Sequence, residues 1–280
     1  MDALWHWLAD PWSGQIMQRA FAEVVLLGIA GGAIGCWIVL NELSYGAESL
    51  PHAMFPGLVL AAIAGAPLLL GGAAGLLVAA VAIALVSRTP RIAGDTAIAV
   101  VVTALFGLGA LLALSRATPA GVQGLLFGDI LGLTTADLLA AAGLTVVVAI
   151  GLTVLHPRLL IASFDRTTAA ALGASPAVAD TALLILLALS VLVAVQALGN
   201  LLVVALLIAP AAAARLVARR MVPMMALAIA LAIACGVAGL YASYHLRTAA
   251  GASIAATMVT VYVLVAAGVR VAGRRVTEAV

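Results

Sequence analysis

The chain has 280 residues, of which 66% are hydrophobic and only 9% are charged, and its formal net charge is +2. A soluble domain is nearer half apolar and a quarter charged, so this composition excludes an ordinary water-soluble fold. No long polar block and no low-complexity linker interrupts the apolar sequence. We therefore expect a single membrane domain, with lipid as its main surrounding and no nucleic-acid partner.

The first 15 residues form a separate short segment. Trp5, Trp7 and Trp12 lie there among polar residues, and indole rings prefer the boundary between lipid and water. Residues 1–15 therefore predict an interfacial N-terminal segment. A cleavable signal peptide is not expected, because the first apolar run comes late and continues into a full span.

The apolar runs that follow predict an all-α, polytopic membrane helical bundle over residues 16–275. A bilayer core of about 30 Å needs about 20 apolar residues per helix. Nine runs meet this need, and they are 16–40, 43–66, 67–87, 95–115, 136–155, 178–198, 200–217, 223–243 and 252–271. The breaks at Gly65-Ala66-Pro67 and at Gly199-Asn200 are tight, so eight spans remain an alternative.

The arginines predict the orientation of the bundle. All thirteen basic residues are arginine, and basic residues gather on the cytoplasmic side of membrane proteins. With nine spans and the N-terminus outside, ten of the thirteen fall in cytoplasmic connections or at a cytoplasmic C-terminus. We therefore expect this orientation in a bacterial cytoplasmic membrane.

The second predicted span carries two ionisable side chains. Glu48 and His52 are four residues apart, so they project from the same helical face about one turn apart. Ionisable groups at this depth are costly, at least about 2.5 kcal/mol each. A carboxylate oxygen and an imidazole nitrogen can together bind a first-row divalent metal ion. A hydrogen-bonded pair that ties spans together and a proton relay are the alternatives.

Two prolines lie in the same span. Pro51 cannot donate a backbone hydrogen bond to Ala47, and Pro56-Gly57 repeats the disturbance one turn later. Transporters often build their sites from broken helices near the middle of the membrane. We therefore expect the helix to be broken or kinked beside Glu48 and His52.

Other polar residues in apolar runs are weaker candidates. Glu23 lies early in the first span, where we expect it to be solvated at the outer interface. Gln196 and Asn200 flank a break, and hydrogen bonding between helices is the expected role. Cys36 and Cys235 sit in apolar runs and are expected to be buried core residues rather than disulfide or metal ligands.

The connection 156–177 is the longest on the predicted cytoplasmic side. Asp165 can cap the N-terminus of a short helix, Gly173 can follow its end, and Pro176 can stop it. Such a helix suits insertion into a groove of a partner protein. An interfacial helix that lies on lipid is the alternative.

Five ordered blocks resemble the family of ABC-type permeases that import manganese, zinc or iron(II). The span block Leu43–Gly57 is similar to the family's segment Leu-Ser-x-x-Gly-Asp-x-x-x-His-x-x-x-Pro-Gly. The other matching blocks are Asp95–Ile98, Phe127–Leu131, Ser163–Asp165 with Ala171–Gly173, and Gln196–Gly199 with Ala209–Ala211 and Arg215. The resemblance covers nearly the whole chain.

This resemblance implies a homodimer of permeases, cytosolic ABC ATPase subunits and an extracytoplasmic metal-binding protein. It implies that Glu48 and His52 line the ion path, and that 164–175 docks on the ATPase. Within that segment the matching residues are Phe164, Asp165, Ala171, Leu172 and Gly173. The divalent metal is then a substrate, with no cofactor bound permanently, and the chain is a transport subunit rather than an enzyme, since it has no phosphate-binding loop.

The sequence departs from the family pattern beside the proposed ligands. Glu48 stands where the family has Asp, Pro51 precedes the histidine, and Asn41-Glu42 replaces a basic pair. These departures leave two further hypotheses open. One is a permease for a chelated metal or another organic substrate, and the other is an ion-coupled secondary transporter.

Overall fold

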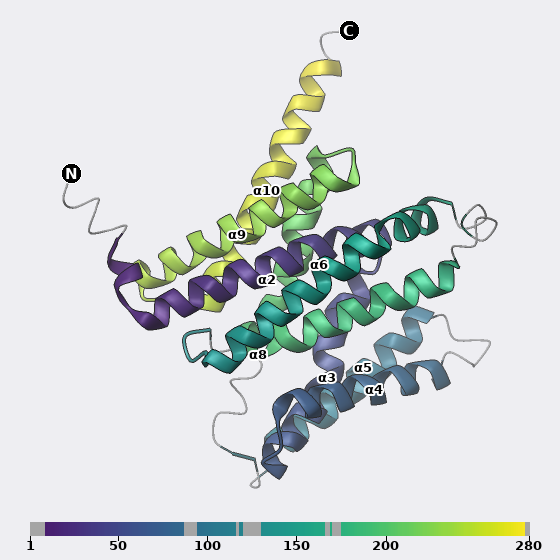
Figure 1. Ribbon diagram of the computed structural model, residues 1–280, viewed down its shortest axis with the longest axis vertical. Coiled ribbons are helices and arrows are strands. Elements are labelled where there is room, and N and C mark those ends of the chain that lie inside the picture. Colours follow the sequence, from purple (N-terminus) through teal and green to yellow (C-terminus); the bar gives the residue numbers. More distant parts are fainter. Residues whose placement is uncertain are drawn as a thin grey trace.

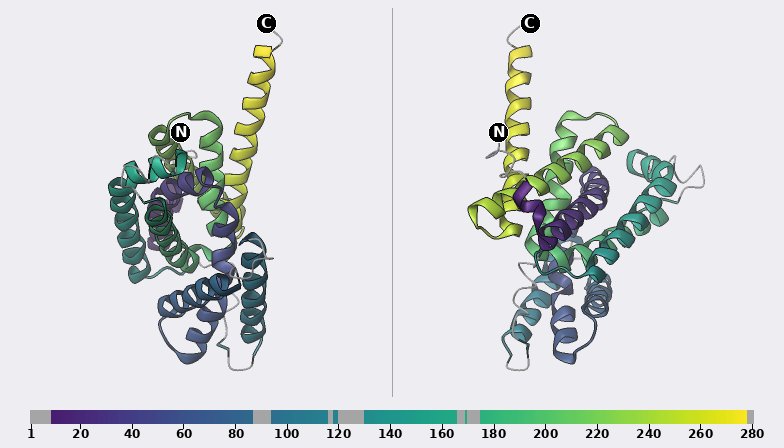
Figure 2. Two further views of the ribbon diagram at one scale, coloured as in Figure 1. Left: turned by 90° about the vertical axis from the view of Figure 1, so that its right-hand side faces the viewer. Right: turned by 60° about the vertical axis from the view of Figure 1, so that its left-hand side comes forward.

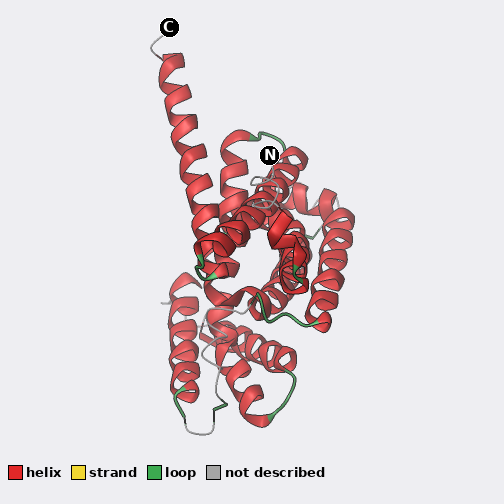
Figure 3. Ribbon diagram, turned by 90° about the vertical axis from the view of Figure 1, so that its left-hand side faces the viewer, coloured by secondary structure: helices red, strands yellow, loops and turns green. Residues whose placement is uncertain are grey.

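The computed structural model describes residues 9–86, 94–115, 118–119, 130–165, 169 and 175–277. All regular structure in these ranges is helical, as Figure 3 shows, so the predicted all-α fold is confirmed. The elements in chain order are η1 (Asp10–Ser13), α2 (Gln15–Leu40), α3 (Ser44–Ala64), α4 (Leu68–Val86), α5 (Gly94–Ala113), α6 (Thr135–Phe164), α8 (Pro176–Val217), α9 (Met221–Leu246) and α10 (Ala250–Thr277).

The helices follow the predicted spans closely. In the described ranges, seven helices are long and apolar enough to cross a membrane, and Leu68–Ile83 and Leu202–Val217 are two shorter apolar helices. Both tight breaks are present. Gly65 ends α3 at a φ of 66°, and Gly199, at φ 74° and ψ 165°, divides α8 into two helical halves. The chain is thus a multi-pass membrane protein, while its predicted orientation stays a prediction.

One helix is longer than the sequence indicates. The predicted span 136–155 is the beginning of α6, which continues through Pro157 to Phe164. Leu159 and Ala162 of this extension are buried in the main core. Burial of these apolar residues stabilises the added turns despite the hydrogen bond that Pro157 removes. The first part of the predicted connection 156–177 is therefore helical.

The helices form two groups. In Figure 1, α2, α6, α8 and α9 cross the upper part of the molecule, and α3, α4 and α5 lie together below them. Within the upper group, α2 packs most extensively on α9 and α8, whereas α3 packs mainly on α4 and α5. The C-terminal helix α10 packs on α8 and α9 and projects past them at its far end (Figure 2). The group around α2 contains most of the core.

Small residues allow close contact between helices. A Cβ atom added at Gly57 would overlap the carbonyl oxygen of Gly71 in α4 and lie 2.9 Å from the Cα of Gly75. In α2, a Cβ at Gly32 would lie 2.8 Å from the Cα of Ile229 in α9. Small residues at such contacts are typical of membrane helices, since dispersion rather than hydrophobic burial holds the helices together. Gly57, expected to loosen α3, is therefore a contact residue.

Candidate functional site

The helix that carries Glu48 and His52 is continuous. The helix is not broken, because α3 runs from Ser44 to Ala64 with both Pro51 and Pro56 inside it, while a kink at the prolines stays a prediction. Each proline still removes one backbone hydrogen bond. Ser49 donates its hydroxyl hydrogen to the Tyr45 carbonyl oxygen (2.8 Å), a further side-chain bond within the same stretch. The packing of α3 against α4 and α5 keeps the helix intact across the prolines.

Glu48 and His52 occupy different environments on this helix. The Glu48 side chain is exposed on the surface of the chain, whereas His52 is half-buried. The imidazole of His52 meets the ring of Phe106 in α5 edge to face, with 5.0 Å between ring centroids. Its Nδ1 is buried and has no hydrogen-bond partner in the described ranges. The carboxylate of Glu48 is close enough to interact with this ring electrostatically.

Glu48 and His52 stand without further side-chain metal ligands in the part of the chain that the structure describes. No group of three or more His, Cys, Asp or Glu side chains comes together among the residues that the structure describes. Transition metals in proteins take at least four ligands. Glu48 and His52 can supply two, a carboxylate oxygen and an imidazole nitrogen, and no third side chain of these types joins them in the described ranges.

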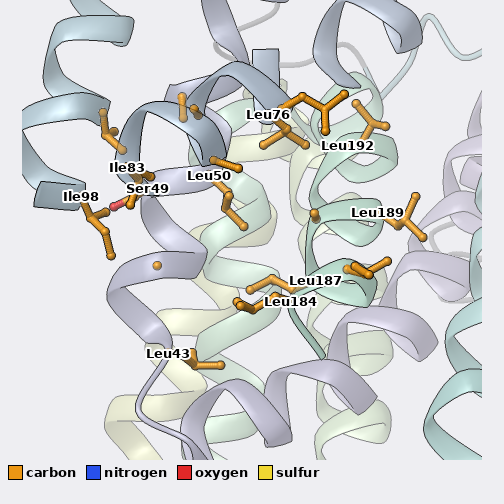
Figure 4. Close-up of a pocket in the computed structure, with 18 of the residues that line it drawn as sticks. Leu43, Ser49, Leu50, Leu76, Ile83, Ile98, Leu184, Leu187, Leu189 and Leu192 are labelled. Atoms are coloured by element: carbon orange, nitrogen blue, oxygen red, sulfur yellow. The ribbon is translucent and has the colours of Figure 1, made fainter. Parts of the chain in front are cut away.

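A cavity of about 670 Å³ lies beside α3. Its lining comes from α3, α4, α5 and α8 and is apolar apart from Ser49 and Thr181. Figure 4 shows the labelled leucine and isoleucine side chains around it, together with Ser49. Glu48 and His52 are not among its lining residues. The cavity depends on how α3, α4, α5 and α8 pack together, so it could not be predicted from the sequence. Its apolar lining does not suit a bare cation.

Glu23 is placed differently from the expectation. It was predicted at the solvated outer interface, but its side chain is fully buried in α2. Neither carboxyl oxygen has a hydrogen-bond partner within the described part of the chain. Arg19, one turn earlier, instead directs its guanidinium to the Leu133 carbonyl oxygen at 3.5 Å. The prediction was wrong because α6 and α9 cover this end of α2.

The predicted coupling segment begins where α6 ends. The Phe164 side chain is 73% exposed, and Asp165 has an extended backbone (φ −147°, ψ 94°). The Ala169 amide donates to the Asp165 carbonyl oxygen at 3.0 Å. Ala171, Leu172 and Gly173 lie outside the described residues, as do the side chains of Gln196 and Asn200.

Cys36 and Cys235 are both free and buried, which confirms their prediction as core residues. Cys36 lies against Ala211, Ala214, Met224 and Ala228. Cys235 belongs to the main core around α2. Neither thiol is near enough to the other titratable groups of the described ranges to form a metal-binding group.

Comparison with known proteins identifies the family to which the chain belongs. The family model of the ABC 3 transport family matches residues 13–268. The chain belongs to the ABC 3 transport family. The solved structure titled "PsaBC from Streptococcus pneumoniae in complex with Fab" superposes with a TM-score of 0.86 at 29% identity, covering 94% of this chain and 95% of that one.

Curated members of the ABC 3 transport family are similar over most of their length. The manganese transport system membrane protein MntC of Halalkalibacterium halodurans is 34% identical over 249 residues, which are 89% of this chain and 85% of MntC. A probable iron transport system membrane protein of Haemophilus influenzae is 30% identical, covering 90% of this chain and 93% of the relative. The chain is thus a multi-pass subunit of the bacterial cytoplasmic membrane. An ion-coupled secondary transporter does not fit this family.

Proposed function

We propose that the chain is the membrane-spanning permease of an ABC importer for divalent transition-metal ions, working as a homodimer. An extracytoplasmic binding protein delivers the ion, and cytosolic ATPase subunits drive its passage. The names of the manganese and iron transport relatives support this substrate class. Zn²⁺ belongs to the same proposal, because the ligand pair suits it equally well.

The observation that carries the proposal is the state of the two side chains in α3. Glu48 is exposed, and the Nδ1 of His52 lacks a hydrogen-bond partner in the described ranges. A buried polar nitrogen without a hydrogen-bond partner is unfavourable by about 1–3 kcal/mol. A metal ion that passes this turn would satisfy it and would gain the Glu48 carboxylate at the same time.

Two copies of the chain would complete the coordination. Each copy contributes one carboxylate and one imidazole, so a pair of α3 helices facing each other offers the four ligands that a transition metal needs. Glu48 is exposed on its own chain, and this leaves it accessible to a second copy. An ion held between two chains can be released when they separate, as transport requires.

The choice of metal depends on the carboxylate. Oxygen ligands suit Mn²⁺, and imidazole suits Zn²⁺ and iron as well. Glu48 is one methylene longer than the aspartate of the family pattern, so it reaches further from the helix axis. We propose that this difference changes the preference among these ions rather than the substrate class.

The arginines support the proposed side of the membrane for ATPase binding. With the N-terminus outside, the end of α6 and the segment 164–175 face the cytoplasm, where the ATPase binds. Phe164, largely exposed at the end of α6, is suited to enter a groove of that partner. Asp165, Ala171, Leu172 and Gly173 complete this proposed docking segment.

The test is uptake of Mn²⁺, Fe²⁺ and Zn²⁺ by cells that express the full importer, measured by elemental analysis. The double variant Glu48→Ala with His52→Ala should reduce uptake of the transported ion to background while the ATPase still co-purifies. Ser49→Ala is the matched control, because the Ser49 hydroxyl bonds within α3. Wild-type uptake by the double variant would contradict the proposed site. Uptake of a metal chelate but not of free ions would favour the alternative of a chelated substrate.

A further inference from the structure

The turn between α2 and α3 is short and tightly bonded. Asn41 is the C-cap residue of α2, Glu42 has a left-handed φ of 58°, and α3 begins at Ser44. The Leu43 amide donates to the Ile38 carbonyl oxygen at 2.9 Å, which is the six-residue closure of a Schellman motif. The end of α2 therefore fixes the position and direction of the first turn of α3.

The end of α6 is bonded to this turn. The Ser163 hydroxyl donates to Asn41 Oδ1 at 2.9 Å. On its other side, Asn41 Nδ2 donates to the Trp37 carbonyl oxygen, also at 2.9 Å. Asn41 thus uses its acceptor for α6 and its donor for α2. Ser163 is the residue directly before Phe164, where the proposed docking segment begins.

A second contact lies further along the same two helices. The rings of Trp37 in α2 and His156 in α6 meet edge to face at 5.5 Å between centroids. The Trp37 side chain is fully buried. The last two turns of α6 are therefore held to the last turn of α2 at two points, and a displacement of one end moves the other.

The rest of α3 has little attachment to α2. It packs on α4, α5 and α8, and its contact with α2 is confined to a small area. Glu48 lies four residues after Ser44, which is about 6 Å along the helix axis. A tilt imposed at the α2–α3 turn therefore reaches the Glu48 carboxylate with only a small contact between α2 and α3 to rearrange.

We propose that the hydrogen bond between Asn41 and Ser163 is the link through which movement of the ATPase-docking segment reaches Glu48 and His52. The two residues are positioning residues that act through the α2–α3 turn. The link rests on the proposed function, since it needs an ATPase at 164–175.

The experiment uses the permease, its ATPase and its binding protein in lipid vesicles with Mn²⁺ as the probe. Mn²⁺ uptake and ATP hydrolysis are measured in the same vesicles for Asn41→Ala, Ser163→Ala and the double variant. Each single variant should lower the number of ions moved per ATP by about threefold to tenfold, the range expected for one hydrogen bond. The double variant should lose no more than either single one, since both changes remove the same bond. ATPase binding should not change.

Two further variants separate a link from a loss of local structure. The double exchange Asn41→Ser with Ser163→Asn keeps the amide and the hydroxyl but reverses their positions. Each exchange alone should lower the number of ions moved per ATP, and the double exchange should restore most of it. Thr153→Ala is the control on α6, because the Thr153 hydroxyl bonds to the Ala149 carbonyl oxygen of its own helix at 2.8 Å. This control should keep the wild-type ratio.

Two outcomes would overturn the link. One is a wild-type ratio in both single alanine variants, and the other is a multiplied loss in the double variant. An exchange variant that assembles and still has the low ratio would also count against it. Failure of the wild-type protein to take up Mn²⁺ in an ATP-dependent way contradicts the proposed function instead, so the two failures are distinguishable.

Discussion

Glu23 in α2 and Glu48 in α3 are carboxylates on consecutive membrane helices, and their surroundings are opposite. Glu23 is fully buried, and its two oxygens have no hydrogen-bond partner in the described ranges. Glu48 is exposed, and it shares its helical face with His52. The helix α2 is covered by α6, α8 and α9, whereas α3 packs mainly on α4 and α5.

From this difference we expect burial within the chain, and not depth in the membrane alone, to separate a transport residue from a structural one. A carboxyl group enclosed by its own chain is not accessible to an ion, however unfavourable its burial is. An exposed carboxylate beside a histidine can meet an ion or a second copy. The helices that cover a carboxyl group decide whether an ion or a second copy can reach it. The predictions below test that distinction.

The largest effect is expected from removing the charge at each position. Glu48→Gln should lower metal uptake more than tenfold, because an amide oxygen is a much weaker ligand for a divalent cation than a carboxylate. Glu23→Gln should leave uptake within about twofold of wild type. Elemental analysis of cells at matched expression levels checks both. Equal losses of metal uptake in the two variants would contradict the different roles proposed for Glu48 and Glu23.

The covered side of α3 should be far less tolerant than its open side. Gly57→Ala places a Cβ against Gly71 and Gly75, and overpacking of this kind destabilises by about 1–3 kcal/mol. Gly46→Ala is the matched control, since its Cβ would meet no atom within 4 Å and alanine favours the helix by up to about 1 kcal/mol. Thermal unfolding in detergent measures both. A Gly57→Ala variant as stable as the wild type would contradict the close contact.

The enclosed carboxyl of α2 should be a source of instability. Glu23→Leu removes buried polar oxygens that have no partner in the described part of the chain, so it should stabilise the protein by about 1–3 kcal/mol. Glu48→Leu, at an exposed position, should change stability by less than about 0.5 kcal/mol. The midpoints of thermal unfolding are the measurement. Destabilisation by Glu23→Leu would mean that the carboxyl has a partner in the assembled transporter.

The smallest effect is expected at the turn that joins the two helices. Glu42 has a φ of 58°, a conformation that is unfavourable for a residue with a Cβ and natural for glycine. Glu42→Gly should stabilise the protein by about 0.5–1 kcal/mol after the added chain entropy is subtracted. Unfolding midpoints check the sign. A loss of stability would indicate that the Glu42 side chain makes a contact of its own.

Apolar length determined most of the fold. The nine predicted runs correspond to helices because a bilayer offers no water to unpaired backbone groups, so each run must be helical. The breaks at Gly65 and Gly199 were also predictable, since glycine adopts a positive φ readily. The Glu48–His52 pair followed from its spacing and from the family pattern.

Other features were decided only when the helices packed. The extension of α6 to Phe164 depends on burial of Leu159 and Ala162 against helices distant in sequence. The same holds for the burial of Glu23, the apolar cavity beside α3 and the Asn41–Ser163 bond. Sequence periodicity reports the environment along one helix, whereas these features depend on which helices become neighbours. The sequence by itself therefore determined the membrane-spanning helices and the proposed ligand pair, and tertiary packing decided which charged groups remain exposed on the chain.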